Sequence, residues 1–361
     1  MSEFSGQSEF FGQNFPALTT VLINPTLAFT SMRVAILYNP RLQSDNPSLP
    51  DDAFEEYDSP ETIVAIAAAL EALGVEPVPV VADRRLPWRL EEGRFDFAFN
   101  IAEGEGRRCR EAVPAAVCEL LGLPFTGSDP LTLAVTLDKA VARRLVSPDV
   151  PVARGSLLDG KGSEGLLEEL RYPVIVKPND EGSSKGIRRD ALCFDRAAAL
   201  DQCRRLQASY ACPVLIEEFL PGMEVTVGVR GNGAAASVLG LMEIEPTDPS
   251  DQYFLYCVET KRDFRRRVRY HLPPRLAPPE LEALRNYALA AYRLLGCRDL
   301  ARLDFRFDAE GRPHFMECNP LPGLNPESGD IVIMSRSILP YEALVQGILV
   351  DAAHRVGVSI V

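Results

Sequence analysis

Residues 32–128 alternate between strand-like and helix-like patterns, and this alternation restricts the fold more than any other feature of the chain. Strand–helix alternation implies a mostly parallel sheet with helices on its faces. Ligands of such sheets collect at the carboxyl ends of the strands, where residues 101–106 follow the third strand pattern. The expected elements are a strand at Arg33–Tyr38, a helix from Pro60 to Leu73, strands at Glu76–Val81 and Phe95–Asn100, and a helix at Arg110–Leu121.

The pattern changes at about Asp129 to short β-rich runs separated by helices. We therefore predict a mixed α/β and α+β chain with an N-terminal α/β domain at 32–128, a central subdomain at 129–222 and a C-terminal subdomain at 223–361. The elements expected after Asp129 are a helix that carries Asp138 and Lys139, strands at Val174–Lys177, Val214–Glu218 and Glu224–Arg230, a helix at Pro279–Leu295, a hairpin at Ala301–Asn319 and a helix at Tyr341–Val356.

Charge and cysteine usage exclude several classes of protein. The chain has 38 basic and 51 acidic residues, a net charge of −13, which argues against a nucleic-acid partner. No apolar stretch approaches the roughly 18 residues of a membrane span, so we expect no membrane partner. The eight cysteines lack a C-x-x-C pair and the three histidines are not paired at ligand spacing, which predicts reduced thiols, no zinc site and a cytoplasmic location. Residues 1–31 lack Lys and Arg, so we expect a loose extension and a natural start at Met32.

The hairpin at Ala301–Asn319 carries the sharpest chemical signal. Strand alternation places Arg302, Asp304 and Arg306 on one face, and the turn brings Asp304 roughly opposite Glu317, which shares its face with Asn319. Two carboxylates and an amide oxygen suit Mg²⁺, and the adjacent arginine can hold a phosphate oxygen. A solvated face with ion pairs is the alternative. The constrained run from Asn319 to Gly323 favours the metal site.

Two further segments have patterns that suit a nucleotide. The strand ending at Lys177 leads into a loop with Gly182, Ser183, Ser184 and Gly186, which favours phosphate binding over an ordinary turn. The run Val214–Glu224 could form a purine hinge, although an edge strand with solvated acids fits it as well. A P-loop kinase is disfavoured because the nearest match, at 155–162, ends in glycine where Ser or Thr is needed.

The order of these motifs resembles the ATP-grasp superfamily, and most closely the D-alanine–D-alanine ligases, over residues 32–356. The resemblance implies an ATP-grasp fold preceded by an N-terminal parallel α/β domain. It also implies two Mg²⁺ ions, with Mn²⁺ as an alternative, held by Asp304, Glu317 and Asn319. For ATP it implies Lys139 and Lys177 at the α- and β-phosphates, Ser183 and Ser184 in a closing loop, Glu217, Glu218 and Leu220 at adenine, Glu224 at ribose and Lys261 at the γ-phosphate.

The same resemblance implies catalytic roles for Arg302 at the transferring phosphoryl group and for the Gly323 N–H as an oxyanion donor. Ser328 would contact the second substrate and Glu103 the first. By this resemblance, four of the five lysines lie at or beside phosphate positions. The scarcity of lysine in the chain agrees with these roles.

Four departures from the family pattern affect the amino-acid subsites. Residues 99–111 lack the usual histidine, Arg262 stands where tyrosine is usual, and residues 325–327 replace a Thr-Ser-His-like run. The N-terminal catalytic glutamate has no motif match, and Glu56 and Asp58 are the acids near its place.

We predict an ATP-dependent carboxylate–amine ligase that acts on small amino acids or peptides through an acyl phosphate and releases ADP and phosphate. The alternatives are a pathway ligase that joins other amino acids or a peptide, and an ATP-binding regulatory module without turnover. A homodimer is left open. The basic run Arg262–Arg269 is either a solvated surface strand or a lid, and Cys318 should point away from the metal ligands.

Overall fold

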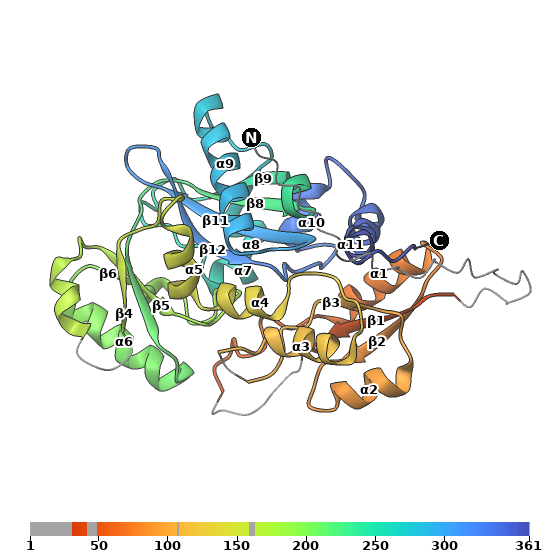
Figure 1. The fold of residues 1–361 in the computed structure, drawn as a ribbon. Helices are drawn as coiled ribbons and strands as arrows, with labels where there is room; N and C mark the ends of the chain where they lie inside the picture. The colour runs from red at the N-terminus through yellow and green to blue at the C-terminus, as the bar shows by residue number, and fades with distance from the viewer. Residues whose placement is uncertain (1–30, 42–48, 107, 159–162, 361) are drawn as a thin grey trace, which may run out of the picture. The chain divides into compact units, whose positions relative to one another are not determined.

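The computed structural model describes residues 31–41, 49–106, 108–158 and 163–360, and its compact unit runs from Met32 to Val361. The predicted extension, 1–31, lies outside the described residues except for Ser31. Residues 159–162, the second half of the segment with the near match to a P-loop, also lie outside the described residues. Figure 1 shows three sheets, each covered by helices. No helix in the described ranges is long and apolar enough to cross a membrane.

The first sheet is parallel, as predicted, with strand order β2–β1–β3. Its strands end at one edge, where Leu37 of β1 pairs with Asn100 of β3. The sequence missed α2, which contains only two buried side chains, Leu86 and Leu90. The elements are β1 (Arg33–Tyr38), β2 (Glu76–Val81), β3 (Phe97–Asn100), α1 (Pro60–Glu71), α2 (Leu86–Gly93), α3 (Ala112–Leu121) and α4 (Pro130–Leu137).

The second sheet is antiparallel, with strand order β4–β7–β5–β6. Helix α6 covers one face, where its Leu206 shares a core cluster with Val176 and Ile216. The other face is therefore left to carry polar side chains such as Lys177. The elements are β4 (Gly155–Leu158), η1 (Ser163–Glu169), β5 (Val174–Pro178), η2 (Arg189–Ala191), β6 (Leu192–Cys193), α6 (Arg196–Tyr210) and β7 (Val214–Glu218).

The third sheet has the order β10–β9–β8–β11–β12, and its neighbouring strands are antiparallel. Helix α9 packs on one face, where Leu303, Phe305 and Phe307 share a core cluster with Leu284. The hairpin alternation is therefore confirmed. The elements are β8 (Glu224–Arg230), η3 (Gly233–Ala235), β9 (Ser237–Pro246), β10 (Val268–His271), α9 (Pro278–Leu294), β11 (Leu300–Phe307) and β12 (Pro313–Asn319).

One core cluster joins the first sheet to the end of the chain. Ile36 of β1 and Ile66 of α1 lie in the same cluster as Leu344 and Ile348 of α11 (Tyr341–Val356). Figure 1 shows α11 beside α1. The three sheets fall within the predicted ranges 32–128, 129–222 and 223–361, whose boundaries stay a prediction.

Two expected elements differ from the structure. The single helix expected to carry Asp138 and Lys139 is two helices, α4 and α5 (Lys139–Val146), with Asp138 between them. The Asp138 side chain accepts a hydrogen bond from the Val141 N–H (3.1 Å) and so caps the start of α5. The basic run is not a surface strand over 262–267. It forms α7 (Val258–Arg262) and α8 (Phe264–Arg267), because arginine favours helix and the first β-branched residue of the run is Val268.

Candidate active site

The hairpin acids lie opposite each other on the face away from α9. Asp304 of β11 pairs with Glu317 of β12, and Arg302 pairs with Asn319, in the predicted register. Arg302 Nη2 lies 2.9 Å from Asp304 Oδ2, and Thr226 of β8 donates a hydrogen bond to the same carboxylate. One sheet face thus presents two carboxylates, an amide and a guanidinium.

Four cations surround Glu317. Lys139 Nζ, at the first residue of α5, lies 3.3 Å from Glu317 Oε2. Burial opposes ionisation of Glu317, but Lys139, Lys177, Arg302 and Lys261 together hold its pKa at about 2. These cations come from α5, the second sheet, the third sheet and α7, so the fold collects positive charge at one point. Such a cluster is suited to a polyanion.

A cavity of about 50 Å³ lies against this cluster. It is lined by residues of both antiparallel sheets and of the segments between them, so the predicted nucleotide and metal residues meet there. The predicted residues in its lining are Lys177, Ser184, Glu224, Lys261, Arg302, Asp304 and Glu317. Glu224 is buried beside Arg306 (Oε2 to Nη1, 3.2 Å), and its burial raises its pKa to about 7.

The loop after β5 has left-handed backbone at two serines, with φ of 48° at Ser183 and 61° at Ser184. This conformation is costly for residues other than glycine, so the surrounding contacts must maintain it. The Ser184 hydroxyl donates to the Tyr256 carbonyl (2.9 Å), which ties the loop to the segment before α7. Ser184 therefore faces the 50 Å³ cavity, while Ser183 lines a neighbouring one.

The two predicted purine-hinge acids point in opposite directions along β7. Glu217 is buried between Lys177 and Arg143, whose Nε lies 2.9 Å from Glu217 Oε1. Glu218 instead accepts from the backbone N–H and the guanidinium of Arg171 (3.0 Å each). The Leu220 carbonyl accepts from Arg306 Nε (2.6 Å). Both glutamates are thus engaged by cations of the chain.

A second, smaller cavity of about 30 Å³ lies on the other side of Glu317. Its lining contains predicted residues, namely Glu103, Lys139, Ser183, Glu317 and Asn319, together with Glu56 and Glu111. The Asn319 side-chain oxygen accepts from the Leu321 N–H (2.9 Å), which fixes the amide at the end of the hairpin. The two cavities share Glu317 as a common wall.

Glu56 is the main residue that the sequence reasoning left unassigned. Its carboxylate is held by Arg110 Nη2 (3.0 Å) and Lys185 Nζ (3.3 Å), and it accepts from the Gly182 N–H (2.5 Å). A Cβ on Gly182 would lie 2.6 Å from Glu56 Oε1, so a larger residue there would displace the Glu56 carboxylate. Lys185 thus serves Glu56 and Glu181 and not the cavities. No local pattern could reveal contacts this distant in the chain.

Five predicted residues lie outside both cavity linings, namely Glu217, Glu218, Leu220, Gly323 and Ser328. Gly323 is exposed, and a Cβ there would meet nothing within 4 Å. Ser328 is exposed, and its hydroxyl donates to Asn325 Oδ1 (3.0 Å). Cys318 lies with its Sγ 3.6 Å from that of Cys297, in the core cluster under the hairpin, so it points away from the acids as predicted.

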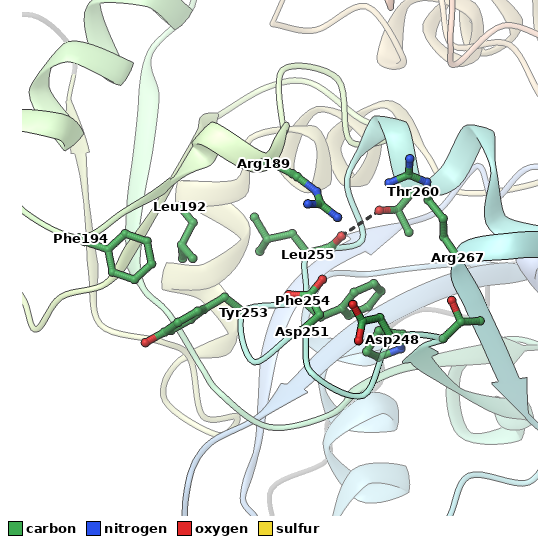
Figure 2. Close-up of a pocket in the computed structure, with 12 residues that line it drawn as sticks. Arg189, Leu192, Phe194, Asp248, Asp251, Tyr253, Phe254, Leu255, Thr260 and Arg267 are labelled. Atoms are coloured by element: carbon green, nitrogen blue, oxygen red, sulfur yellow. Dashed lines mark hydrogen bonds between the residues drawn. The ribbon is translucent and has the colours of Figure 1, made fainter.

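Two other features lie apart from the predicted residues. A groove of about 270 Å³ runs past Phe194, Tyr253 and Arg189 (Figure 2), and no predicted site residue lines it. On β9 and β10, Glu243, Glu245 and His271 come close enough to hold a metal ion. Arg275 Nη2 lies 2.6 Å from an oxygen of each glutamate and already supplies the compensating positive charge.

Comparison with known proteins identifies the family. The model of the D-ala D-ala ligase C-terminus matches residues 154–350. A D-alanine–D-alanine ligase of Gloeobacter violaceus is 33% identical over 305 residues, covering 81% of this chain and 95% of the relative. The chain belongs to the D-alanine–D-alanine ligase family. This membership confirms the predicted resemblance and the predicted class of activity, an ATP-dependent ligase.

Further relatives agree with this membership in the D-alanine–D-alanine ligase family. An uncharacterized protein of Sinorhizobium fredii, y4sG, is 31% identical, covering 81% of this chain and 87% of the relative. The crystal structure of D-alanine–D-alanine ligase from Bacillus anthracis complexed with ATP superposes with a TM-score of 0.69, at 19% identity over 90% of this chain and 98% of that chain. The predicted ATP-grasp fold is therefore confirmed.

Proposed function

We propose that this protein joins the carboxylate of one small amino acid to the amine of a second, and that ATP drives the reaction. The observation that carries the proposal is the convergence of Lys139, Lys177, Lys261 and Arg302 on Glu317. A triphosphate and a carboxylate substrate are both anionic, so a reaction between them needs concentrated positive charge. The fold supplies that charge from four separate segments.

The nucleotide residues have roles that follow from their positions. Lys139 and Lys177 bind the α- and β-phosphates, and Lys261 reaches the γ-phosphate from α7. Ser183 and Ser184 close over the phosphates through their loop. At the other end, Glu224 binds ribose, while the backbone near Glu217, Glu218 and Leu220 reads adenine. The Coulomb attraction of the lysines is strong here because the site is partly buried.

The donor set of the hairpin fits a hard divalent cation. Asp304, Glu317 and Asn319 present carboxylate and amide oxygens on one face, and Arg302 and Lys139 now neutralise the two acids. We assign these three residues to Mg²⁺, as two ions, with Mn²⁺ as an alternative. When bound, the metal neutralises charge on the transferring phosphoryl group.

The residues of the chain then act mainly by alignment. Arg302 steadies the phosphoryl group while it passes to the first carboxylate, which becomes an acyl phosphate. The amine of the second substrate attacks, the Gly323 N–H stabilises the oxyanion, and phosphate leaves. Ser328 binds the carboxylate of the second substrate, and Glu103 contacts the first. The products are the amide, ADP and phosphate. A cytoplasmic location and a homodimer remain predictions.

A pathway ligase for amino acids other than alanine is a second candidate. The observation that favours it is the lining of the small cavity, where Glu56, Glu103 and Glu111 stand together. A regulatory module without turnover is a weaker candidate, because such a module needs no hairpin acids beside Arg302.

One experiment separates these candidates. The full-length protein is incubated with Mg-ATP and a pool of D- and L-amino acids, and ADP and new amides are measured by mass spectrometry. Formation of ADP with an amide supports the ligase. D-alanyl-D-alanine as the product supports the family reaction, and any other dipeptide supports the pathway ligase. No ADP with any acceptor overturns the ligase in favour of the regulatory module.

A further inference from the structure

Two glutamates that line the 30 Å³ cavity make no side-chain hydrogen bond or ion pair with the described residues. Glu103 follows β3, and Glu111 directly precedes α3, where its side chain makes no capping hydrogen bond. Glu111 is only 6% exposed and lines the cavity. Within the described part of the chain, neither carboxyl has a hydrogen bond or an ion pair. A buried acid without a partner is costly, so this pair needs an explanation from outside the chain.

The cations of the neighbourhood are already used. Arg110 donates to Glu56 and to the Asp180 carbonyl (2.7 Å), and Lys185 lies between Glu56 and Glu181. Lys139 is paired with Glu317. These positive groups are therefore paired with other acids. Arg110 and Lys139 act on Glu111 only through the longer-range attraction of their charges, which does not offset the burial of Glu111.

The electrostatics of the pair agree with this geometry. Burial raises the pKa of Glu111 to about 8, and burial together with the charge of Glu111 raises the pKa of Glu103 well above its usual range. A cation placed between them would reverse this effect, because an opposite charge favours the ionised form. A positively charged occupant would thus favour the ionised form of both glutamates.

The orientation of that occupant follows from the opposite wall. Glu317, Asn319 and Lys139 line the same cavity and belong to the proposed phosphoryl-transfer site. The carboxylate of the first substrate must lie at that wall in order to accept the phosphoryl group. Its ammonium end then lies towards Glu103 and Glu111, and two unpaired carboxyls can neutralise two ammonium groups.

We infer that the first substrate is a short diamino acid, whose α-ammonium and side-chain ammonium bind between Glu103 and Glu111. The inference rests on the proposed ligase function and names the substrate class of its first site. The side chain must be short, because the cavity is small, about 30 Å³. Residues 99–111 lack the histidine that is usual in the segment for the first amino acid, and Glu103 lies in this segment. The departure in sequence and the proposed change in substrate therefore concern the same segment.

The test uses hydroxylamine as the acceptor, which converts an acyl phosphate to a hydroxamate and so reports on the first substrate alone. The hydroxamate is measured through its coloured complex with Fe³⁺. The full-length protein is given Mg-ATP and, separately, each enantiomer of alanine, serine, 2,3-diaminopropionate and 2,4-diaminobutyrate. We expect kcat/KM for one diamino acid to exceed that for alanine at least tenfold. Alanine used equally well or better overturns the inference and leaves the ligase intact. No hydroxamate and no ADP with any amino acid overturns the ligase itself.

Two isosteric variants locate the specificity. Glu103→Gln and Glu111→Gln keep the shape of the side chain and remove its charge, and each should lower the diamino-to-alanine ratio at least tenfold. Glu119→Gln is the matched control, because Glu119 is exposed on the same helix as Glu111. An unchanged ratio in both cavity variants overturns the assignment of the two ammonium groups. Circular dichroism verifies that each variant is folded.

Discussion

Arg262 Nη1 lies 2.7 Å from Asp51 Oδ2, which joins α7 to the segment before α1. The same guanidinium reaches Glu55 Oε2 (3.1 Å), one residue before Glu56. The position where related ligases usually carry tyrosine therefore connects two segments that are 211 residues apart in the chain. Through it, the segment that carries Glu56 is held against the small cavity.

We predict that Arg262→Gln weakens binding of the first substrate without disabling the chemistry. The ion pairs are partly exposed, and such pairs contribute at most about 1 kcal/mol. We expect KM for the first substrate to rise about two- to fivefold, with kcat changed less than twofold. The variant should also lose part of the salt dependence of KM, measured between low and high NaCl. Arg265→Gln, at an exposed arginine of α8, is the control, and identical behaviour of the two variants would contradict the prediction.

We predict that Asp304→Asn and Glu317→Gln abolish ADP formation and weaken metal binding. Each variant removes one carboxylate of the proposed metal site and breaks its ion pair with Arg302 or Lys139. Metal binding is followed by the electron paramagnetic resonance of Mn²⁺ in the presence of ADP, which needs no turnover. Glu310→Gln, in the exposed turn of the same hairpin, should behave like the unmodified protein. Normal Mn²⁺ binding by both acid variants would remove the metal assignment.

We predict that Lys177→Ala lowers ATP affinity at least tenfold, measured by isothermal titration calorimetry. The lysine lines the larger cavity, and its loss removes a buried positive charge beside the proposed phosphates. Arg154→Ala removes an exposed arginine that pairs with Glu169 and should leave the affinity within twofold. Equal affinities of the two variants would count against the phosphate role of Lys177.

We predict that Glu111→Gln stabilises the protein more at pH 8 than at pH 5. The pKa of Glu111 is raised from 4.5 to about 8 in the fold, chiefly by burial. Between these values the folded state binds more protons than the unfolded state, so the contribution of Glu111 to stability falls as pH rises. The glutamine side chain does not ionise, so the variant does not lose stability in this way as pH rises. Its melting temperature should exceed that of the parent by about 2 °C or more at pH 8. Calorimetry of Glu111→Gln beside Glu119→Gln checks this, and a lower melting temperature at pH 8 would refute it.

Local patterns were enough to predict the hairpin and its register. The period of two along a strand places Asp304 and Phe305 on opposite faces, and a short turn returns Glu317 opposite Asp304. The parallel sheet could be predicted from strand–helix alternation in the same way. The hairpin register and the strand–helix alternation are both set by residues close in sequence. The single helix predicted to carry Asp138 was wrong, because the Asp138 side chain caps α5 and a new helix begins there.

The sequence by itself therefore determined the family, the order of the nucleotide and metal motifs, and the face of the hairpin that carries the acids. Only the tertiary structure decided that Glu56 lies between Arg110 and Lys185, which are 54 and 129 residues away, and that Glu103 and Glu111 line one small cavity. The physical reason is that burial and ion pairing depend on segments brought together by folding. No spacing along the chain encodes which charges will be left without a partner.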